Sequence, residues 1–147
     1  MYADAGCVLV GDPRPWLASA QQHGMLVFTL NHTSAAFTKA DAFAALGMPI
    51  AVWGPRPLLV ATVLTIQRRP ETLAFVREWL EWCEHGQLLT DAPSAAPNAP
   101  EFVDHRHDQS LFSLLAYKRN VSLVLPYDPT WPPEEARILA AVRRRNE

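Results

Sequence analysis

Seven polar or titratable side chains stand next to one another from Asp104 to Ser110 and lead directly into an apolar pattern. In that pattern Leu111, Leu114 and Leu115 repeat at the spacing of one helix face. The chain therefore has to bury a helix whose first turn carries several groups able to do chemistry, which a plain surface loop does not require. We predict a helix here and place any chemistry of the chain at its N-terminal end.

Asp108 stands where the N-cap of this helix is expected, so its carboxylate can accept a hydrogen bond from the amide of Ser110 or Leu111. Its spacing to Leu111, Phe112 and Leu115 also predicts that the carboxylate lies along the buried stripe and points toward the edge of the core. Such a carboxylate is either a helix cap or a catalytic group, and the residues leave both interpretations open.

The composition predicts one domain over residues 1–147, because 49% of the residues are hydrophobic and 19% are charged, as in globular chains. The formal net charge of -2 provides no basic surface for nucleic acid or an anionic membrane, and the basic run Arg143–Arg145 lies in the tail. No apolar run reaches the roughly 18 to 20 residues of a membrane span. We therefore expect neither nucleic acid as a partner nor a membrane span.

Cys7 and Cys83 lack metal-ligand spacing, and the N-terminus carries no secretory signal. Both observations favour reduced thiols, no disulfide and a cytoplasmic location.

Proline and glycine divide much of the chain into expected elements. These are a helix after Pro13 that ends at Gly24, a strand from Met25 to Leu30, a strand from Leu58 to Ile66, and a helix that starts at Pro70 and closes at Gly86. The last helix is predicted to bury a stripe of Leu73, Val76, Leu80 and Cys83, widened by Trp79. Trp79 and Trp82 could be platforms on which a sugar stacks, but aromatic residues at this spacing are far more often core or interface residues, so we do not place them in a site.

Thr38 and Asp41 form a capping-box-like pair ahead of Phe43, with Gly47 as the C-terminal stop of a short helix. Asp91 to Pro100 is an aperiodic stretch that predicts a lid or a connector. After the central motif we expect a strand from Val121 to Leu125, a connection from Pro126 to Pro133 and a terminal helix from Glu134 to Arg145.

Three stretches belong together when known families are considered. They are His105-Arg106-His107-Asp108-Gln109-Ser110, Tyr2-Ala3-Asp4-Ala5-Gly6-Cys7, and Phe37-Thr38-Lys39-Ala40-Asp41-Ala42-Phe43 followed by Leu46-Gly47. In order and approximate spacing they resemble a family of glycosyltransferase-like proteins with the GT-A fold of nucleotide-diphospho-sugar transferases. The resemblance spans about Tyr2 to Val124.

The resemblance implies an α/β fold, a partial GT-A-like mixed sheet flanked by helices. In the family the first motif follows a buried strand of the nucleotide-binding half, so the chain looks like the C-terminal half of a larger enzyme and is expected to bind nucleotide sugar weakly by itself. A missing neighbour strand would leave an exposed sheet edge near Tyr2 to Val10. A second copy of the chain or its own terminal segment could cover that edge.

Asp4 occupies the position of the family's Asp-x-Asp motif, at a strand end where α/β sheets place ligand-binding groups. By resemblance it would hold Mn²⁺ or Mg²⁺ against the sugar-nucleotide diphosphate. Gly6 stands where the second carboxylate is usual, and Asp4-Ala5-Gly6 also has the composition of a simple turn.

The resemblance also assigns roles around the central motif. Asp108 and Gln109 would be catalytic, with Asp108 acting on or positioning the acceptor and Gln109 bound to the sugar. Asp4, Lys39, Asp41 and Arg106 would bind substrate, and His105 and His107 would join Asp4 at the metal. We expect these residues to converge on one cleft, although the capping pattern alone also explains Lys39 and Asp41.

The leading functional hypothesis is transfer of a sugar from a nucleotide-diphosphate donor to a carbohydrate acceptor. A non-catalytic carbohydrate-binding or interaction remnant is the alternative from another class. A metallohydrolase is a further enzyme hypothesis, because His105-x-His107 with Asp108 is similar to histidine-rich metal sites, but the third His of the metallo-β-lactamase pattern is missing.

Overall fold

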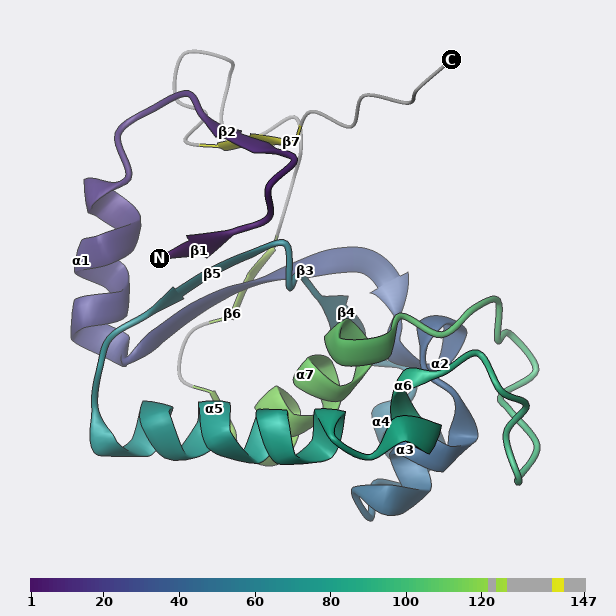
Figure 1. Ribbon diagram of the computed structural model, residues 1–147. Helices are drawn as coiled ribbons and strands as arrows, with labels where there is room; N and C mark the ends of the chain where they lie inside the picture. Colours follow the sequence, from purple (N-terminus) through teal and green to yellow (C-terminus); the bar gives the residue numbers. More distant parts are fainter. Residues whose placement is uncertain (122–123, 127–138, 142–147) are drawn as a thin grey trace.

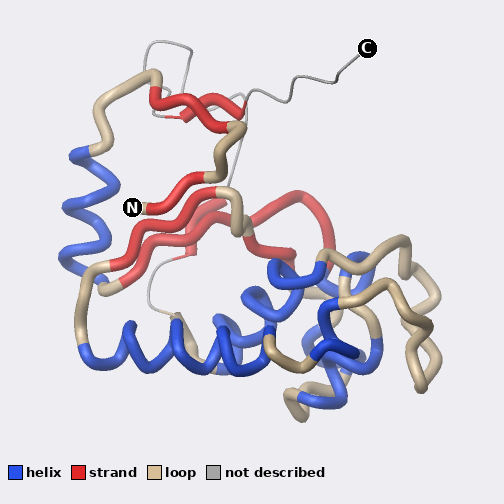
Figure 2. Tube along the Cα trace, viewed as in Figure 1, coloured by secondary structure: helices blue, strands red, loops and turns tan. Residues whose placement is uncertain are grey.

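The computed structural model describes residues 1–121, 124–126 and 139–141, which form a mixed α/β fold (Figure 1). The strands are β1 (Tyr2–Ala3), β2 (Cys7–Leu9), β3 (Met25–Thr33), β4 (Pro57–Leu59), β5 (Val63–Ile66), β6 (Val124–Pro126) and β7 (Leu139–Ala141). The helices are α1 (Arg14–His23), α2 (Ser34–Phe37), α3 (Ala40–Ala45), α4 (Ile50–Trp53), α5 (Pro70–Cys83), α6 (Gly86–Leu89) and α7 (His107–Lys118). Figure 2 shows how the strands gather into a sheet between these helices.

The long strand β3 organises the main sheet. The strand order is β1-β5-β3-β4 with antiparallel pairing throughout, and β6 joins β3 in parallel. A second, smaller sheet pairs β2 with β7 in antiparallel register (Figure 1). An exposed sheet edge was expected near Tyr2 to Val10. Within it, the segment Cys7–Leu9 is paired with β7, a strand from the terminal part of the same chain.

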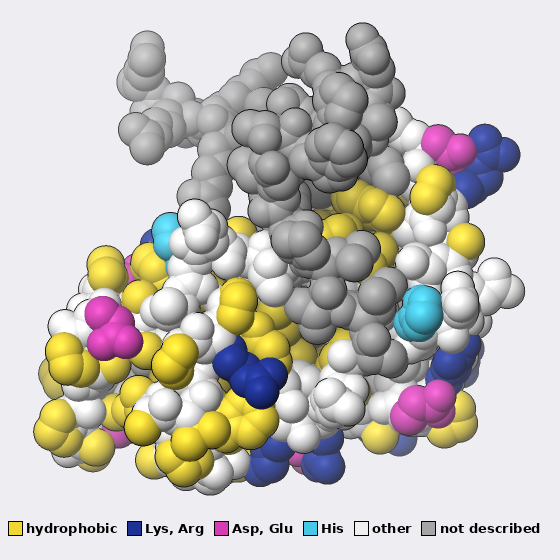
Figure 3. All heavy atoms as spheres, turned by 180° about the vertical axis from the view of Figure 1, so that it is seen from behind, with side chains coloured by type: hydrophobic (Ala, Val, Ile, Leu, Met, Phe, Trp, Pro, Cys, Tyr) yellow, Lys and Arg dark blue, Asp and Glu magenta, His cyan; other side chains and the backbone are white. Residues whose placement is uncertain are grey.

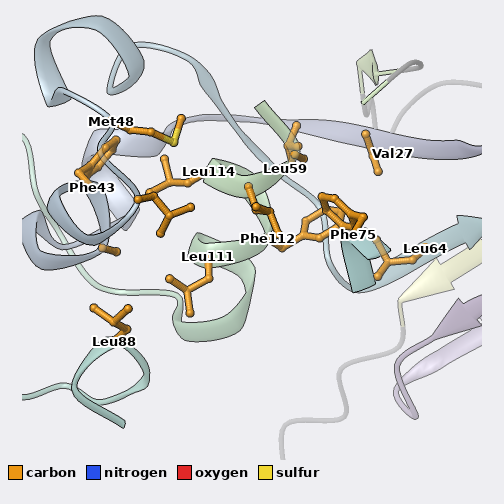
Figure 4. Close-up of a cluster of buried hydrophobic side chains, with 14 of the residues drawn as sticks. Val27, Phe43, Met48, Leu59, Leu64, Phe75, Leu88, Leu111, Phe112 and Leu114 are labelled. Carbon is orange, nitrogen blue, oxygen red and sulfur yellow. The ribbon is translucent and has the colours of Figure 1, made fainter. Parts of the chain in front are cut away.

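Alternation along β3 divides the core between the two faces of the sheet, because successive side chains of a strand point to opposite sides. Met25 and Val27 join the cluster that contains α7, which Figure 4 shows in close-up. Leu26 and Phe28 join a second cluster with Ala20 of α1. Helix α1 therefore covers one face, and α5 and α7 cover the other.

Helix α7 lies at the centre of the larger cluster, as the sequence predicts. Its residues from Ser110 to Ala116 are all buried, and Leu111, Phe112, Leu114 and Leu115 are 0% exposed. A helix that is buried all round needs partners on every side, and here the sheet, α5, α3 and α6 supply them.

The single strand predicted from Leu58 to Ile66 is interrupted, and the segment forms β4 and β5. Both parts pair antiparallel with β3, with Leu59 opposite Thr29 and Ile66 opposite Met25. Because β3 advances by fewer residues between these pairs than the segment does, the residues between Leu59 and Val63 are extra and break the pairing.

The predicted buried stripe of α5 is confirmed for Trp79 and Cys83, which are partly buried against the core, and is wrong for its other three residues. Leu73, Val76 and Leu80 are 39%, 36% and 59% exposed, whereas Thr72 and Phe75 are buried. The reason is aromatic packing: the rings of Phe75 and Trp79 lie 5.8 and 5.0 Å from the ring of Phe112 in α7. That contact turns the aromatic side of α5 inward. The helix ends at Cys83, and Gly86 begins α6 instead of closing α5.

The predicted capping box at Thr38 is not formed. Helix α3 has Lys39 at its N-cap, and the amide of Ala40 donates to Oδ1 of Asn98 at 2.7 Å. Among the described residues, Oγ1 of Thr38 is buried without a hydrogen-bond partner. A side chain from a distant loop has taken over the capping role.

Of the two terminal elements that can be compared with prediction, one agrees and one differs. Val124 and Leu125 lie in β6, in line with the predicted strand. Leu139–Ala141 form strand β7, so the helix predicted from Glu134 to Arg145 is wrong over those residues. Its other residues, and the connection over 127–133, lie outside the described part of the chain.

Candidate functional site

A cavity of about 500 Å³ opens where β1 and β5 meet α5 and the start of α7. The residues that line it are Met1, Tyr2, Asp4, Ala61, Thr62, Leu64, Ile66, Val76, Trp79, Asp108 and Gln109. This volume lies within the range of about 300 to 1,000 Å³ in which small-molecule sites fall. The cavity therefore has room for a ligand of the size of a sugar.

The lining combines two carboxylates with hydrogen-bonding and apolar groups. Asp4 and Asp108 supply the carboxylates, and Trp79 supplies an aromatic surface. Among the described residues that line the cavity, none is a Lys, Arg or His. The charged side chains of the lining are thus both acidic.

Asp4 follows β1, the strand-end position that the sequence predicts. Its backbone N–H donates to the carbonyl of Thr62 at 2.9 Å, which ties it to the segment before β5. The hydroxyl of Tyr2 donates to Oδ1 of Asp4 at 2.7 Å. This hydrogen bond, together with the negative charges of Asp4 and Asp108, raises the pKa of Tyr2.

Asp108 is not the N-cap of α7, contrary to one of its two predicted roles. Arg106 is the capping residue, and its carbonyl accepts the amides of Gln109 and Ser110 at 3.0 and 3.4 Å. His107 adopts a left-handed backbone with φ of 48° at the helix start. Asp108 lies in the first turn and is exposed at the cavity instead of facing the core edge. At this position the positive end of the dipole of α7 stabilises the negative charge of Asp108.

Gln109 joins the cavity to the sheet. Its Nε2 donates to the carbonyl of Leu59 in β4 at 2.8 Å. One turn later, Oγ of Ser113 accepts the amide of Leu59 at 3.0 Å. Helix α7 is thereby fixed to both backbone groups of one residue in the sheet, which holds Asp108 in register with the cavity.

Trp79 belongs to the cavity although its pattern indicates a core residue. Its Nε1–H donates to the backbone carbonyl of Asp108 at 3.0 Å, and its ring packs on Phe112. Helical spacing cannot separate a core aromatic residue from one that lines a cavity, so no sequence signal assigns it. Tyr2 has a detectable signal, because it precedes Asp4 by two residues and so lies on the same side of an extended strand.

His105 is a buried structural residue, 3% exposed. Its Nε2 lies 2.8 Å from the carbonyl of Leu88, and its Nδ1 accepts the amide of Lys39 at 3.3 Å. A carbonyl can only accept, so Nε2 carries the proton and the ring is neutral. Burial lowers the pKa of His105. Both ring nitrogens are occupied, so the predicted role of His105 as a metal ligand does not fit this structure, and the metallohydrolase hypothesis loses one of its two histidines.

Lys39 is 2% exposed and does not line the cavity. Its ammonium donates to the carbonyl of Thr90 at 2.9 Å and to that of Gln87. Cations are favourable at the C-terminal end of a helix such as α6. Lys39 lines a separate cavity of about 130 Å³ together with His105. Its ammonium therefore holds α6 in place and lies outside the cavity of Asp4 and Asp108.

The remaining predicted residues hold the loop and the start of α7. Asp41 accepts the amide of Ala95 at 3.0 Å, which anchors the loop predicted as a lid or connector. Arg106 pairs with Asp104 at 3.6 Å, and its guanidinium lies 5.1 Å from the centre of the Phe37 ring. His107 pairs with Asp91 at 2.8 Å. Asp41, Arg106 and His107 are not among the residues that line either cavity.

The expected single cleft is therefore divided. The structure brings Asp4, Asp108 and Gln109 to one cavity. It places Lys39 and His105 at a second cavity, where their polar side-chain atoms are hydrogen-bonded to backbone groups.

Comparisons with protein-family models, with curated proteins and with solved structures found no match to this chain. In the described residues, no three His, Cys, Asp or Glu side chains form a group that could hold a metal ion. No helix of the described ranges has the length and apolar character needed to cross a membrane. On the face shown in Figure 3, the Lys and Arg side chains that are described are spread in small groups and do not form one continuous basic area.

Proposed function

We propose that this chain is a glycosyltransferase-like domain of the GT-A type, and that the cavity of Asp4 and Asp108 binds the sugar of a nucleotide-diphosphate donor for transfer to a carbohydrate acceptor. The observation that carries the proposal is the shared cavity. Two stretches that resemble the same family lie far apart in the sequence, and each contributes a carboxylate to one space. Carboxylates, an amide and an aromatic ring around a cavity suit a ligand rich in hydroxyl groups.

Asp108 has the exposure that a catalytic carboxylate needs. If the reaction inverts the anomeric centre, Asp108 takes the proton of the acceptor hydroxyl as general base. If the reaction retains it, the negative charge of Asp108 stabilises the positive charge that develops on the sugar ring. Gln109 has its amide nitrogen committed to Leu59, so its amide oxygen is the atom that would accept a sugar hydroxyl.

The chemistry of the lining fits a divalent cation. Asp4 provides hard oxygen ligands, and Mg²⁺ commonly binds through one or two carboxylates plus substrate phosphates while keeping several waters. Mg²⁺ or Mn²⁺ held by Asp4 would neutralise the leaving diphosphate and leave Asp108 available for its catalytic role. Tyr2 already donates to one oxygen of Asp4 and so fixes the orientation of that carboxylate.

A non-catalytic carbohydrate-binding domain is the second candidate. One observation favours it: the described lining residues include no Lys, Arg or His that could bind a diphosphate directly. The two candidate functions differ in their need for a cation. Without a basic side chain in the lining, transfer from a diphosphate donor needs a cation to neutralise the diphosphate, whereas binding of a sugar alone does not.

An NMR titration with UDP-glucose, with and without Mg²⁺, tests the proposal, since NMR detects affinities as weak as about millimolar. We expect shifts at the Trp79 indole and the Gln109 amide that are larger when Mg²⁺ is present. Equal binding of free glucose and UDP-glucose, with no effect of the cation, would favour the binding domain. No shift at these positions with any sugar would refute both.

A further inference from the structure

We propose that the sugar bound in this cavity is uncharged and packs against the indole of Trp79, so that Trp79 and the two carboxylates together select the substrate. This inference rests on the proposed function and deepens it, because it names the class of sugar and the residue that recognises its ring. Three observations carry it: how Trp79 is held, which residues lie beside it, and the sign of the charges in the lining.

Trp79 is held in place before any ligand arrives. Its ring lies 5.0 Å from that of Phe112, which is fully buried, and its N–H is bonded to the carbonyl of Asp108. Few rotamers of the indole can satisfy both contacts, so little side-chain freedom is left to lose on binding. The hydrogen bond also links Trp79 to the backbone of Asp108, so the ring keeps a fixed position relative to the first turn of α7.

The neighbours of Trp79 in the lining extend an apolar surface. Val76 precedes it by one helical turn in α5, and Ile66 and Leu64 come from β5. A pyranose ring has faces of C–H groups that pack on such a surface, while its hydroxyls need hydrogen-bond partners. Asp4, Thr62, Asp108 and Gln109 supply those partners within the same cavity.

The charge of the lining determines which sugars are accepted. Asp4 and Asp108 are acidic, and among the described lining residues no basic side chain offsets them. A bound Mg²⁺ does not change this balance, because its two positive charges are matched by the two negative charges of the diphosphate that binds with it. A sugar that carries its own carboxylate would bring a third negative charge to the cavity, and like charges in one site disfavour binding. A neutral hexose meets no such repulsion and can donate its hydroxyls to the carboxylates.

UDP-glucose and UDP-glucuronate form a matched pair of probes, because they share the nucleotide and differ only in the C6 group. We expect UDP-glucose to bind at least about tenfold more tightly in NMR titrations at the same Mg²⁺ concentration, since tenfold corresponds to one modest charge–charge repulsion. UDP alone reports the share of the affinity that the nucleotide contributes. Equal affinity for the two sugars would overturn the assignment of an uncharged substrate.

Three variants isolate the role of Trp79. Trp79→Leu removes the ring and should weaken binding of UDP-glucose by about tenfold, the upper end of what one aromatic contact contributes. Trp79→Phe keeps a ring without the N–H, and binding should stay within about threefold of the original chain. Trp82→Leu is the matched control, because Trp82 lies in the same helix, is partly buried and does not line the cavity. It should leave the affinity unchanged.

A measurement on the unaltered chain avoids any doubt about the folding of the variants. In saturation-transfer NMR, the C–H protons on one face of the glucose ring should receive more saturation and shift upfield, as expected beside an aromatic ring. Uniform saturation around the ring, or full affinity in Trp79→Leu while UDP-glucose still binds the original chain, would overturn the stacking but leave the proposed function standing. Failure of the original chain to bind any nucleotide sugar would overturn both.

Discussion

The start of α7 has two sides that look alike in the sequence and differ in the structure. On one side His105 and Lys39 are both buried. The polar atoms of their side chains are hydrogen-bonded to backbone groups. On the other side Asp108 and Gln109 reach an open cavity shared with Asp4. Both sides belong to one short polar stretch. The comparison teaches that a polar residue serves a site only when the fold leaves at least one of its polar atoms available to a ligand.

The largest expected effect is on turnover. Asp108→Asn should lower any transferase activity by about a hundredfold or more, because asparagine can neither accept the proton nor carry the charge. Its unfolding free energy should change by no more than about 1 kcal/mol, the size of a helix-dipole contact. Steady-state kinetics and urea unfolding of the variant measure the two quantities.

Asp41→Asn is the matched control for that experiment, since Asp41 is a carboxylate that anchors a loop away from the cavity. Its turnover should equal that of the original chain. A similar loss of activity in both variants would mean that the cavity and the loop are one site after all.

For the buried side, which contains Lys39 and His105, we expect a substitution to lower the stability of the fold without weakening the binding of UDP-glucose. Lys39→Met should lower the unfolding free energy by about 3 kcal/mol, because it leaves the part-buried hydrogen-bonding positions at the carbonyls of Gln87 and Thr90 without a donor. Affinity for UDP-glucose should not change. Lys118→Met is the control: Lys118 also donates to a carbonyl, that of Leu46, but it is exposed, so the loss should stay within about 1 kcal/mol. Urea unfolding curves of both variants would contradict the assignment if their losses were equal.

His105 should make this side sensitive to acid. Burial lowers the pKa of His105 in the folded chain, so the unfolded chain takes up a proton first as the pH falls below about 6.5. The stabilising contribution is present above that pH and is lost as the pH falls toward the lowered folded-state pKa. The slope of unfolding free energy against pH reaches at most about 1.4 kcal/mol per pH unit for one proton. Urea unfolding between pH 7.5 and 5 should show this slope, and His105→Gln should flatten it.

The smallest expected effect concerns Tyr2 on the cavity side. Because the hydrogen bond to Asp4 raises the pKa of Tyr2, Asp4→Asn should lower that pKa toward its ordinary value near 10. Titration of the Tyr2 ring resonances by NMR measures the change. An unchanged midpoint would show that Tyr2 does not hold the carboxylate of Asp4 in solution.

Local signals predicted much of the fold. The helix that Gly24 ends, the start of β3 at Met25 and the start of α5 at Pro70 follow from residues next to one another in the chain. The buried side of α5 did not follow, because α5 carries both an aliphatic and an aromatic stripe. Only the position of Phe112 decides which stripe faces inward.

The site was predictable to the same extent. Strand-end placement located Asp4, and the polar stretch located Asp108 and Gln109. The burial of Lys39 was not predictable, since its carbonyl partners lie 48 and 51 residues further along the chain. The capping of α3 by Asn98 instead of Thr38 has the same origin: a partner distant in sequence replaced a local one.

The contact of α7 with β4 also bears on how the molecule avoids aggregation. β4 ends the strand order of the main sheet, and such a strand normally offers free backbone groups on which another chain can grow. Here the amide and carbonyl of Leu59 are bonded to Ser113 and Gln109, and the carbonyl of Pro57 accepts the hydroxyl of Tyr117 at 2.6 Å. Proline has no amide to donate. The helix that carries Asp108 to the cavity therefore also removes a template for fibril growth, and exposure of that template marks any state in which α7 has come away from the sheet.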